Sequence, residues 1–450
     1  MLRNRSLFAL CAVLLLALPL AASANNNTDT SAPNWAEHVA PMLYENCVSC
    51  HRPGQVAPMS LLSYKEARPW AKSIRNVVSS KTMPPWFADP AHGTFAEDPR
   101  LSDAEIALIS NWVAAGAPAG DLSKAPEAPT FSSDWQIGQP DVILTMEPFQ
   151  ITDEMEDHYE WIRVENPLEK DMWIKELEVR PTFMAGAHHN LTYITPADFT
   201  VEDIEGAGRM EMDYVSGWAP GVVPTHYPDG YGKLLPAGSA IWFQMHYHKD
   251  PGPGTGGIDE TSVGLNFWEG EPENKLTTLW VVDPVLQIPP NEANYVSKSE
   301  HTFPHDAILF DFTPHMHLRG KSMKFTITYP DGREEVALNV PNYDFNWQLT
   351  YSPVDPLILP AGTTVKVDAV FDNSAGNPAN PDPSITVTWG EETTDEMMIG
   401  FMNYSMVDKA HQDDMENFAV PPALREQMKR MREWREQQRA QQDQDSSGDE

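Results

Sequence analysis

The sequence contains one pair of cysteines at a spacing that suits covalent haem attachment. Cys47-Val48-Ser49-Cys50-His51 places two thiols three positions apart, followed at once by a histidine. In c-type haem proteins such thiols form thioether bonds to the porphyrin, and the adjacent imidazole reaches the iron. The other interpretations are a redox dithiol or half of a zinc site, although a zinc site normally uses more cysteines. We expect one haem c on Cys47, Cys50 and His51.

A second axial haem ligand is expected further along the chain. Met59, Met83 and His92 all follow the cysteine pair. Met83 is preferred because it precedes Pro84-Pro85, and two prolines stiffen a loop that could hold a sulfur against iron. Met59 is the next choice. The alternative for Met83 is a core methionine that fills a gap.

Six histidines form three tight pairs in the second part of the chain: His188 and His189, His246 and His248, His315 and His317. Side chains at i and i+2 of a strand share a face, so two of these pairs can each direct two imidazoles at one ion. The adjacent pair needs a local twist to converge. Neutral imidazole suits copper or zinc. One pair alone could be coincidence, but three pairs predict metal binding.

Met397, in Thr394-Asp395-Glu396-Met397-Met398, is a further candidate ligand. A thioether selects copper, particularly Cu(I), over zinc or magnesium. A Met-Met pair on its own is more often part of a core.

The order of these motifs resembles a known family. Ala187-His188-His189-Asn190, Gln244-Met245-His246-Tyr247, Pro314-His315-Met316-His317 and Asp395-Glu396-Met397 are similar to the copper type II, ascorbate-dependent monooxygenases, which include peptidylglycine α-hydroxylating monooxygenase and dopamine β-hydroxylase. The resemblance covers about residues 134–410. It implies that His188, His189 and His246 hold one copper that relays electrons, and that His315, His317 and Met397 hold a second copper where oxygen binds. His248 has no role in that pattern, but its strand position keeps it as a possible ligand.

The resemblance implies an exported monooxygenase that hydroxylates a C–H bond of a small organic substrate with O2. Its cofactors would be two copper ions and one haem c, which would pass electrons from an external donor, either an ascorbate-like reductant or a redox protein. No acid–base catalytic residue is expected. The alternatives are a non-catalytic periplasmic haem and copper electron-transfer or copper-binding protein, and a structural sandwich whose histidines bind nothing.

The sequence also departs from the family. The peptide-hydroxylating member anchors a substrate carboxylate with an arginine, an asparagine and a tyrosine, and the corresponding positions here are Thr313, Ile399 and Phe401. A peptide carboxylate is therefore not expected as substrate. No cysteine follows Cys50, so the second part of the chain must be held by packing rather than by disulfides.

Two patterns of secondary structure predict the domain organisation. Helical periodicity over 35–46, 64–80 and from a capping box at Ser102–Glu105 to Gly116 predicts an all-α unit at 33–119 that resembles a class I cytochrome c domain. A Pro-containing linker at 120–133 follows. Beyond it, short β-rich runs separated by turn residues predict two antiparallel, jelly-roll-like β-sandwiches at 134–283 and 284–410. The better strand candidates are 141–146, 173–180, 241–248, 307–312, 324–328, 364–371 and 385–389.

The ends and the charge of the chain bear on location and partners. Arg3 and Arg5, an apolar run over 7–22 and Ala22-Ser23-Ala24 predict a signal peptide at 1–24, hence a periplasmic or secreted protein. No later stretch reaches the roughly 18 apolar residues of a membrane span. The net charge of -34 argues against a nucleic-acid partner. The charged tail at 411–450 is expected to be partly helical or disordered.

Overall fold

The structure is a computed structural model that describes residues 32–55, 57–131, 135–205, 212–219 and 222–419. The predicted signal peptide and residues 420–450 of the predicted tail lie outside the described residues. In these described ranges, no helix is both long and apolar enough to cross a membrane.

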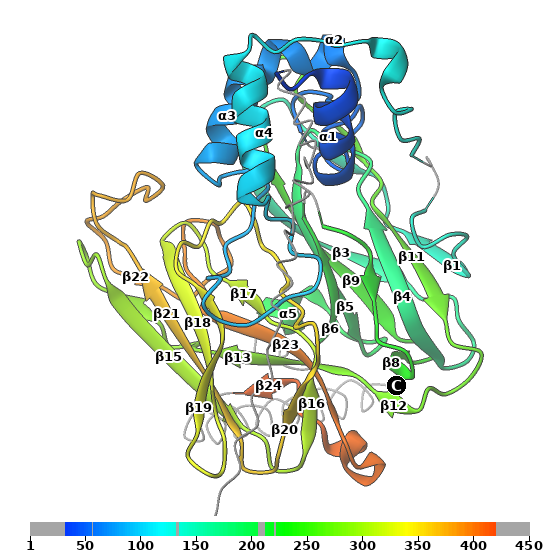
Figure 1. Ribbon diagram of the computed structural model, residues 1–450. Coiled ribbons are helices and arrows are strands. Elements are labelled where there is room, and N and C mark those ends of the chain that lie inside the picture. Colours follow the sequence, from blue (N-terminus) through cyan, green and yellow to red (C-terminus); the bar gives the residue numbers. More distant parts are fainter. Residues whose placement is uncertain (1–31, 56, 132–134, 206–211, 220–221, 420–450) are drawn as a thin grey trace, which may run out of the picture.

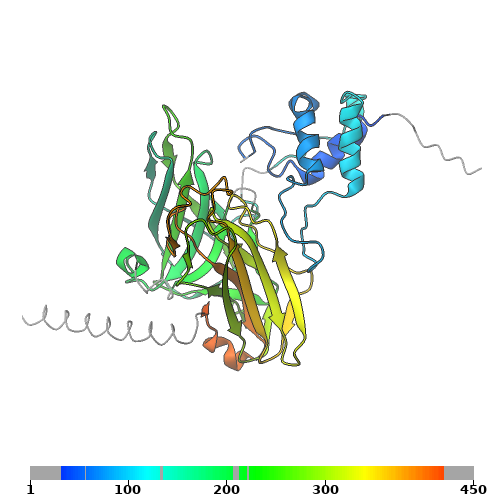
Figure 2. The ribbon, with the colours of Figure 1, turned by 90° about the vertical axis from the view of Figure 1, so that its left-hand side faces the viewer.

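Short helices in the first part of the chain lie together beyond one end of the sheets (Figures 1 and 2). They are η1 Trp35–Val39, α1 Ala40–Asn46, α2 Tyr64–Ala67, η2 Arg68–Trp70, α3 Ala71–Ser79 and α4 Asp103–Ala114. The predicted capping box is confirmed: the Ser102 hydroxyl accepts the Glu105 N–H, and the Glu105 carboxylate accepts the Ser102 N–H. Trp35 and Trp112 are fully buried in the apolar cluster that joins these helices. Two further one-turn elements, η3 Leu122–Lys124 and α5 Val201–Glu205, follow later in the chain.

Residues 84–100 contain no helix and leave the helical segment to pack on a β-sheet core. Ala88 and Phe95 belong to that core, and Trp86 contacts it. The Trp86 ring lies edge-on to Tyr351 with 4.7 Å between centroids, and Phe95 lies 5.7 Å from the same tyrosine. Backbone hydrogen bonds join Ala96 to Ser352 and Asp89 to Asn339. The loop therefore shares its core with the sheets.

Two of the larger sheets share one apolar core. The four-stranded sheet has the order β3 (Asp157–Glu165), β9 (Ala240–His248), β5 (Ala187–Thr195) and β6 (Asp213–Trp218). The six-stranded sheet has the order β1 (Val142–Thr145), β11 (Ser262–Phe267), β4 (Met172–Arg180), β8 (Tyr231–Leu235) and β12 (Asn274–Lys275), with β7 (Thr225–His226) beside β4. Phe243 and Met245 of β9 pack into their common core. A small sheet of β2 (Phe149–Ile151) and β10 (Gly257–Asp259) adjoins them.

The other two larger sheets share a second core. One has the order β20 (Leu357–Leu359), β16 (Ala307–Leu309), β23 (Ile399–Met406), β13 (Thr277–Val282) and β24 (Phe418–Ala419), with β17 (Thr313–His315) beside β23. The other has the order β15 (Tyr295–Thr302), β21 (Thr364–Phe371), β18 (Gly320–Thr328) and β19 (Glu334–Val340). A small sheet of β14 (Gln287–Ile288) and β22 (Val387–Thr388) and the 3-10 turn η5 (Lys409–Asp414) complete this half. Strand β13, just before the predicted boundary at 283, pairs with β23.

The predicted fold class, an all-α cytochrome c-like domain followed by two jelly-roll-like sandwiches, is wrong. The protein is mostly β, with 36% strand and 14% helix, and its small sheets lie in a four-blade, propeller-like arrangement. An all-α cytochrome domain over 33–119 is not evident. The physical reason is that residues 84–100, counted in that domain, bury Ala88 and Phe95 in a β-sheet core. Local helical periodicity cannot reveal where such a loop finds its partner.

A further apolar cluster joins the two halves and underlies the candidate site. Tyr193 and Trp242, from β5 and β9, meet Trp280 of β13 and Phe401 of β23. These four residues lie on the sheet faces opposite to the two main cores. Any site built on these faces is therefore enclosed by both halves of the β region.

Candidate metal centres and the pocket between them

The alternation of side chains along three neighbouring strands places the first histidines. In β9, Ile241, Phe243, Met245 and Tyr247 enter the core, so Gln244, His246 and His248 occupy the opposite face. His246 pairs in register with His189 of β5 and with Tyr159 of β3. Since registered partners share a face, His189 and His246 project from the same side of the sheet.

His188 joins them because of an irregularity in β5. The register between β5 and β9 shifts between Ala187 and His189, where β5 has one extra residue. Such a bulge re-aims a side chain that alternation would send to the other face. The local twist that the adjacent histidine pair requires is therefore present at this bulge.

The three imidazoles converge on one point. The Nδ1 atoms of His188, His189 and His246 lie 3.1 to 3.2 Å from one another. Three such nitrogens cannot all be joined by good hydrogen bonds, since each neutral ring has one N–H at most. Copper or zinc could be held by these three nitrogens, since neutral imidazole suits both metals. This three-histidine cluster could therefore hold a metal ion.

A carboxylate and a ring fix the orientation of His246. Its Nε2 lies 2.5 Å from Asp157 Oδ1 and 3.4 Å from the Thr393 hydroxyl. The Tyr159 ring stacks on the imidazole with centroids 4.1 Å apart, and its hydroxyl bonds to Thr393. A carboxylate on the far nitrogen is the usual support for a metal-binding histidine, because it fixes the tautomer and raises ligand basicity. His248 is exposed, and its Nδ1 lies 3.5 Å from Asp157 Oδ1. It lies outside the three-histidine cluster.

The second predicted set of ligands also comes together. His315 ends β17, which pairs with β23, and His317 follows two residues later. The centroids of the two rings are 5.3 Å apart at 90°. His315 Nδ1 bonds to Gln348 Oε1 at 2.7 Å, and His317 Nδ1 donates to the Asp395 carbonyl at 3.3 Å, so each ring keeps Nε2 for another partner. Buried Met397 lines the same pocket as both rings.

Two buried polar side chains, Glu396 and Arg319, hold the segments that carry His317 and Met397. The Glu396 carboxylate accepts the backbone N–H groups of His317, at 2.9 Å, and of Arg319, at 2.5 Å. The Arg319 guanidinium bonds to the Thr394 carbonyl and to Asn373 Oδ1. Glu396 precedes Met397, so one carboxylate links both ligand-bearing segments. Burial raises the pKa of Glu396 to about 8.

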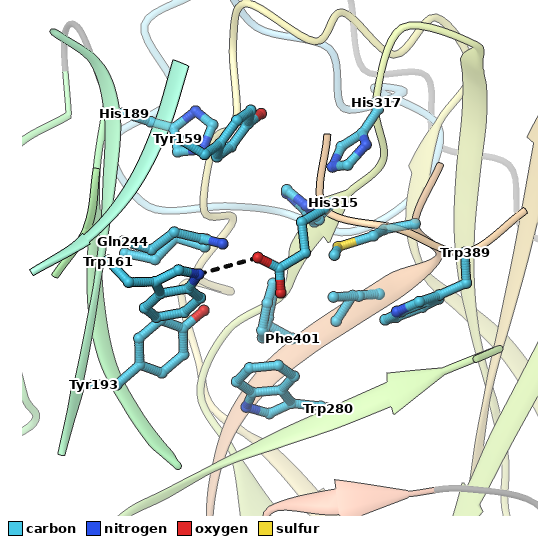
Figure 3. A pocket seen from close by; sticks show the side chains of 14 residues that line it. Tyr159, Trp161, His189, Tyr193, Gln244, Trp280, His315, His317, Trp389 and Phe401 are labelled. Atoms are coloured by element: carbon cyan, nitrogen blue, oxygen red, sulfur yellow. Dashed lines mark hydrogen bonds between the residues drawn. The ribbon is translucent and has the colours of Figure 1, made fainter. Parts of the chain in front are cut away.

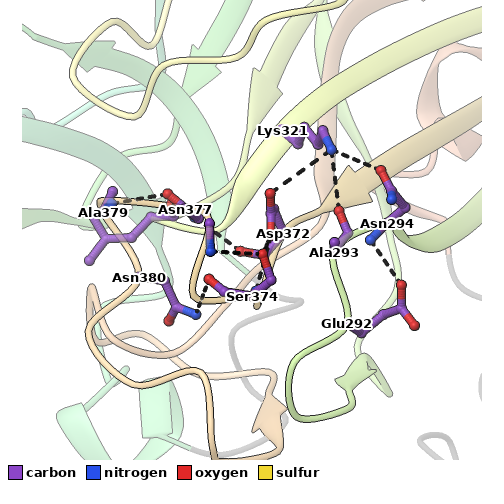
Figure 4. Close-up of polar contacts among 11 residues, drawn as sticks. Glu292, Ala293, Asn294, Lys321, Asp372, Ser374, Asn377, Ala379 and Asn380 are labelled. Carbon is purple, nitrogen blue, oxygen red and sulfur yellow. Dashed lines mark hydrogen bonds and ion pairs between the residues drawn. The ribbon is translucent and has the colours of Figure 1, made fainter.

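The loop around Asn373 is fixed in turn by a polar cluster next to β21 (Figure 4). Asp372 accepts from the backbone and hydroxyl of Ser374, and Asn377 donates to the Asp372 carbonyl. Lys321 lies 3.9 Å from Asp372 and donates to Asn294. This cluster supports the site from outside, because Asn373 is the residue that binds Arg319.

A single aromatic ring lies close to both sets of histidines. The Phe345 centroid lies 5.3 Å from that of His188, 6.2 Å from His246 and 5.9 Å from His317. The loop that carries Phe345 also supplies Gln348 to His315. The same phenyl ring is thus a neighbour of both candidate metal centres.

The pocket between the centres, which we call the central pocket, lies between the facing sides of the β3-β9-β5 and β13-β23 strands (Figure 3). Its cavity volume is about 20 Å³, so it is narrow. The residues that line it are Tyr159, Trp161, His189, Leu191, Tyr193, Gln244, Trp280, His315, His317, Trp389, Glu391, Met397, Ile399 and Phe401. Ligand candidates from both centres therefore face one space.

Burial keeps these histidines neutral. Desolvation, with smaller contributions from neighbouring histidines, lowers the pKa of His188 to about 4 and that of His189 well below its usual range. Desolvation also lowers the pKa of His315 to about 4 and that of His317 to about 3. The pKa of His246 is lowered by burial despite Asp157, which acts in the opposite direction. A neutral imidazole has the lone pair that a metal needs.

The predicted haem ligands lie on the helical segment. Cys47 and Cys50 are half-buried and not joined to each other, and His51 donates from Nδ1 to the Met59 carbonyl at 3.3 Å, which leaves Nε2 available. Free thiols beside an oriented imidazole fit covalent haem. The Met59 carbonyl is the group that binds His51 Nδ1. Met83 is half-buried, and its N–H bonds to the Val77 carbonyl.

Several residues of the site were not found from the sequence. Asp157, Gln348 and Glu396 support ligands from other strands or loops, and Phe345 contacts histidines of both centres. No local motif marks them, because each acts through a contact distant in sequence. Among these residues, only Glu396 had a signal in the sequence that could have indicated a role at the site, because it directly precedes the predicted ligand Met397.

Comparison with known proteins does not identify the chain. No family model matches it, and no curated protein sequence matches it. Among solved structures, the major capsid protein P2 of bacteriophage PM2 is 8% identical, covering 60% of this chain and 98% of that one, with a TM-score of 0.26. The infectious bursal disease virus VP2 subviral particle is 11% identical over 69% and 92%, and a carbohydrate-binding tandem from Paenibacillus barcinonensis Xyn10C is 7% identical over 62% and 100%; both TM-scores are 0.16. These similarities are too weak to support any argument.

Replacing Asp157 by Asn should weaken metal binding by the three-histidine cluster. The amide keeps the shape but loses the charge that raises the basicity of His246, and loss of such a partner typically costs about 10- to 100-fold in metal affinity. Competitive titration with a chelator measures the affinity. The matched control is Glu160→Gln, which alters a carboxylate of the same strand that binds His158 instead. Equal affinity of wild type and Asp157→Asn would contradict the role of Asp157.

Acid should destabilise the metal-free protein. An unfolded histidine titrates near pH 6.5, whereas His188 and His315 titrate near 4 when folded. The unfolded state therefore binds more protons between these values, so the free energy of unfolding falls as pH drops from about 6.5 to about 4. Urea denaturation at several pH values measures this slope. His315→Gln should flatten it; an unchanged slope in that variant would contradict the account.

Proposed function

We propose that this protein is a copper-dependent monooxygenase that hydroxylates a C–H bond of a small molecule with O2. One observation carries the proposal: His189 of the three-histidine cluster lines the same narrow pocket as His315, His317 and Met397. Such a reaction requires the oxygen-binding centre beside the substrate and the electron-relay centre close enough to pass electrons to it. The ordered motif resemblance described above supports the same assignment.

The donor sets favour copper at both centres. Three neutral imidazoles suit an ion that alternates between Cu(II) and Cu(I). Two imidazoles and a thioether favour Cu(I), since a soft sulfur ligand selects the reduced ion. When bound, copper would supply one-electron transfer and oxygen activation. The protein's own residues orient the ligands and exclude water from the site.

The residues around the centres have three tasks. Asp157 and Gln348 orient His246 and His315 through the ring nitrogens that do not face the metal. Glu396 holds His317 and Met397 together through backbone contacts. The aromatic walls of the central pocket exclude water, so that a reactive oxidant meets substrate rather than solvent.

We further propose that a haem attached to Cys47 and Cys50, with His51 as a ligand, passes electrons from an external donor to the copper centres. The haem would supply one-electron storage. The contact of the 84–100 loop with the β core supports this role, because it fixes the helical segment against the half that carries His315 and His317. A predicted signal peptide would place these steps in the periplasm or outside the cell.

The test of the proposed function combines metal content with oxygen uptake. The full chain with its metals should contain two coppers and one iron, and should consume O2 with a reductant when the right small molecule is added. His246→Ala and His317→Ala should each lose one copper and all substrate-dependent oxygen uptake. His226→Ala, a replacement on the surface, is the matched control and should lose neither.

Two results would contradict the proposal. Wild-type protein without copper would exclude it. Protein that binds two coppers, accepts electrons and hydroxylates no member of a broad substrate panel would favour a non-catalytic electron carrier instead.

A further inference from the structure

Positive charge gathers on one short segment of this acidic chain. Between positions 65 and 81 there are five basic residues and one acidic residue, so the segment carries 5 minus 1, or +4. The rest of the chain therefore carries -34 minus 4, or -38. We call the five basic residues the basic stripe; they are Lys65, Arg68, Lys72, Arg75 and Lys81. A local reversal of sign of this kind is typical of a surface that receives a negatively charged partner.

Helical spacing brings the members of the basic stripe together. Helices α2 and α3 follow each other through the single turn η2. The first four members are three, four and three positions apart, the spacing at which helical side chains are neighbours. The opposite side of α3 is buried in the core of the helical segment through Ala71, Ile74 and Val78. Figure 1 shows α3 at the outer edge of that segment, with α4 beside it.

The protein's own carboxylates do not neutralise the basic stripe. Within the part of the chain that the structure describes, none of its five members forms an ion pair. Arg68 donates to the Gly116 carbonyl at 3.0 Å, and Arg75 donates to the Asn76 side-chain oxygen at 3.1 Å. Both acceptors are uncharged, and the three lysines are exposed. The positive charge of the basic stripe is therefore available to another molecule.

We infer that the basic stripe is the docking surface for an acidic protein. Complementary charges steer such a partner to the stripe and fix its orientation there. Trp70, which is 41% exposed, lies within the same segment, and tryptophan and arginine are the residues that most often dominate the binding energy of protein interfaces. The segment thus combines uncompensated charge with an aromatic anchor.

An anionic membrane fits this surface less well than a protein does. A helix that binds a bilayer buries an apolar face in it, whereas the apolar face of α3 is already buried in the helical core. A bilayer is also much wider than the stripe, so its charge would come close to the acidic remainder of the chain. A compact protein can touch the stripe alone, and salt screens the other charges over about 8 Å under physiological conditions.

The position of the basic stripe indicates what the docked protein would do. The apolar side of α3 belongs to the cluster that also contains Val48 and Cys47, so a partner on the stripe would lie against the segment that carries Cys47, Cys50 and His51. The partner would then be the electron donor, an acidic redox protein rather than a small reductant. This role as donor rests on the proposed function; the docking does not.

The test uses a fluorescently labelled acidic [2Fe–2S] ferredoxin as probe and the full chain with its metals. Fluorescence anisotropy measures the dissociation constant at ionic strengths of about 0.01 M and about 0.1 M. The ferredoxin should bind at the lower value and at least about tenfold more weakly at the higher one, because the Debye length shortens from about 30 to about 10 Å. Absence of binding at about 0.01 M, or binding that does not depend on salt, would overturn the inference.

Variants assign the binding to the basic stripe. Lys65→Gln, Lys72→Gln and Lys81→Gln together should weaken ferredoxin binding at least about fivefold, since several charge contacts are lost at once. Arginine at the same three positions keeps the charge and should keep the affinity within about twofold. The matched control is a triple lysine-to-glutamine variant in the sheet of β15, β18 and β21, which changes the net charge equally; its positions are Lys298, Lys324 and Lys366. Equal affinities of the two glutamine variants would overturn the inference.

Two further measurements distinguish the other negatively charged occupants. Vesicles of phosphatidylglycerol are sedimented with the chain, and sedimentation velocity measures its self-association. Loss of vesicle binding or of self-association in the glutamine variant of the stripe, without any binding of ferredoxin, would assign the stripe to a membrane or to a second copy and would overturn the inference.

The outcome is separable from that of the proposed function, because docking is measured without O2 or substrate. Stripe-dependent ferredoxin binding without any copper-dependent oxygen uptake would contradict the proposed function alone. Copper-dependent hydroxylation by a protein whose basic stripe binds no ferredoxin would contradict this inference alone.

Discussion

The site depends on strand register. Side chains on a strand alternate between two faces, so a slip of one residue would exchange the histidines of β9 for core residues. The register of β9 is fixed by the apolar residues that alternate with the polar ones. Phe243, Met245 and Tyr247 are buried in the core. Gln244 and His246 are therefore left on the opposite face. The same alternation along β23 places Ile399 and Phe401 toward the pocket. Large buried apolar side chains thus determine where small polar ligands point.

Two loops join the candidate centres into one unit. The loop with Phe345 and Gln348 touches rings of both histidine sets. The 389–397 loop contacts His246 through Thr393 and His317 through Glu396, and then supplies Met397. Movement of either loop would therefore alter both centres together.

The sequence predicted which histidines lie close together better than it predicted the architecture. Pairs at i and i+2 identified histidines that share a strand face, and the predicted strands at 241–248 and 364–371 occur as β9 and β21. Alternation is local, so it can be read without coordinates. Supporting residues such as Asp157 and Gln348 act across strands and loops, and no spacing marks them. The bulge that turns His188 toward the cluster depends on pairing with β9, which is a long-range event.

The fold class failed for a related reason. Helical periodicity at 35–46 and 103–114 correctly indicated helices. A domain, however, is defined by which surfaces are buried together. Phe95 and Ala88 are apolar residues in a segment without periodicity, and their partner lies about 250 residues away in the β region. The order of strands in the sheets is set by similar distant contacts. Helices and strands could be predicted from local sequence patterns. How they pack together could not, because it depends on contacts between residues far apart in the sequence.

X-ray absorption at the copper edge of the Cu(I)-loaded protein tests the central claim that one centre combines two imidazoles with a thioether. The account predicts sulfur scattering in the wild type, its loss in Met397→Leu and its persistence in His246→Ala. Absence of sulfur from the wild-type spectrum, or its persistence in Met397→Leu, would contradict the account.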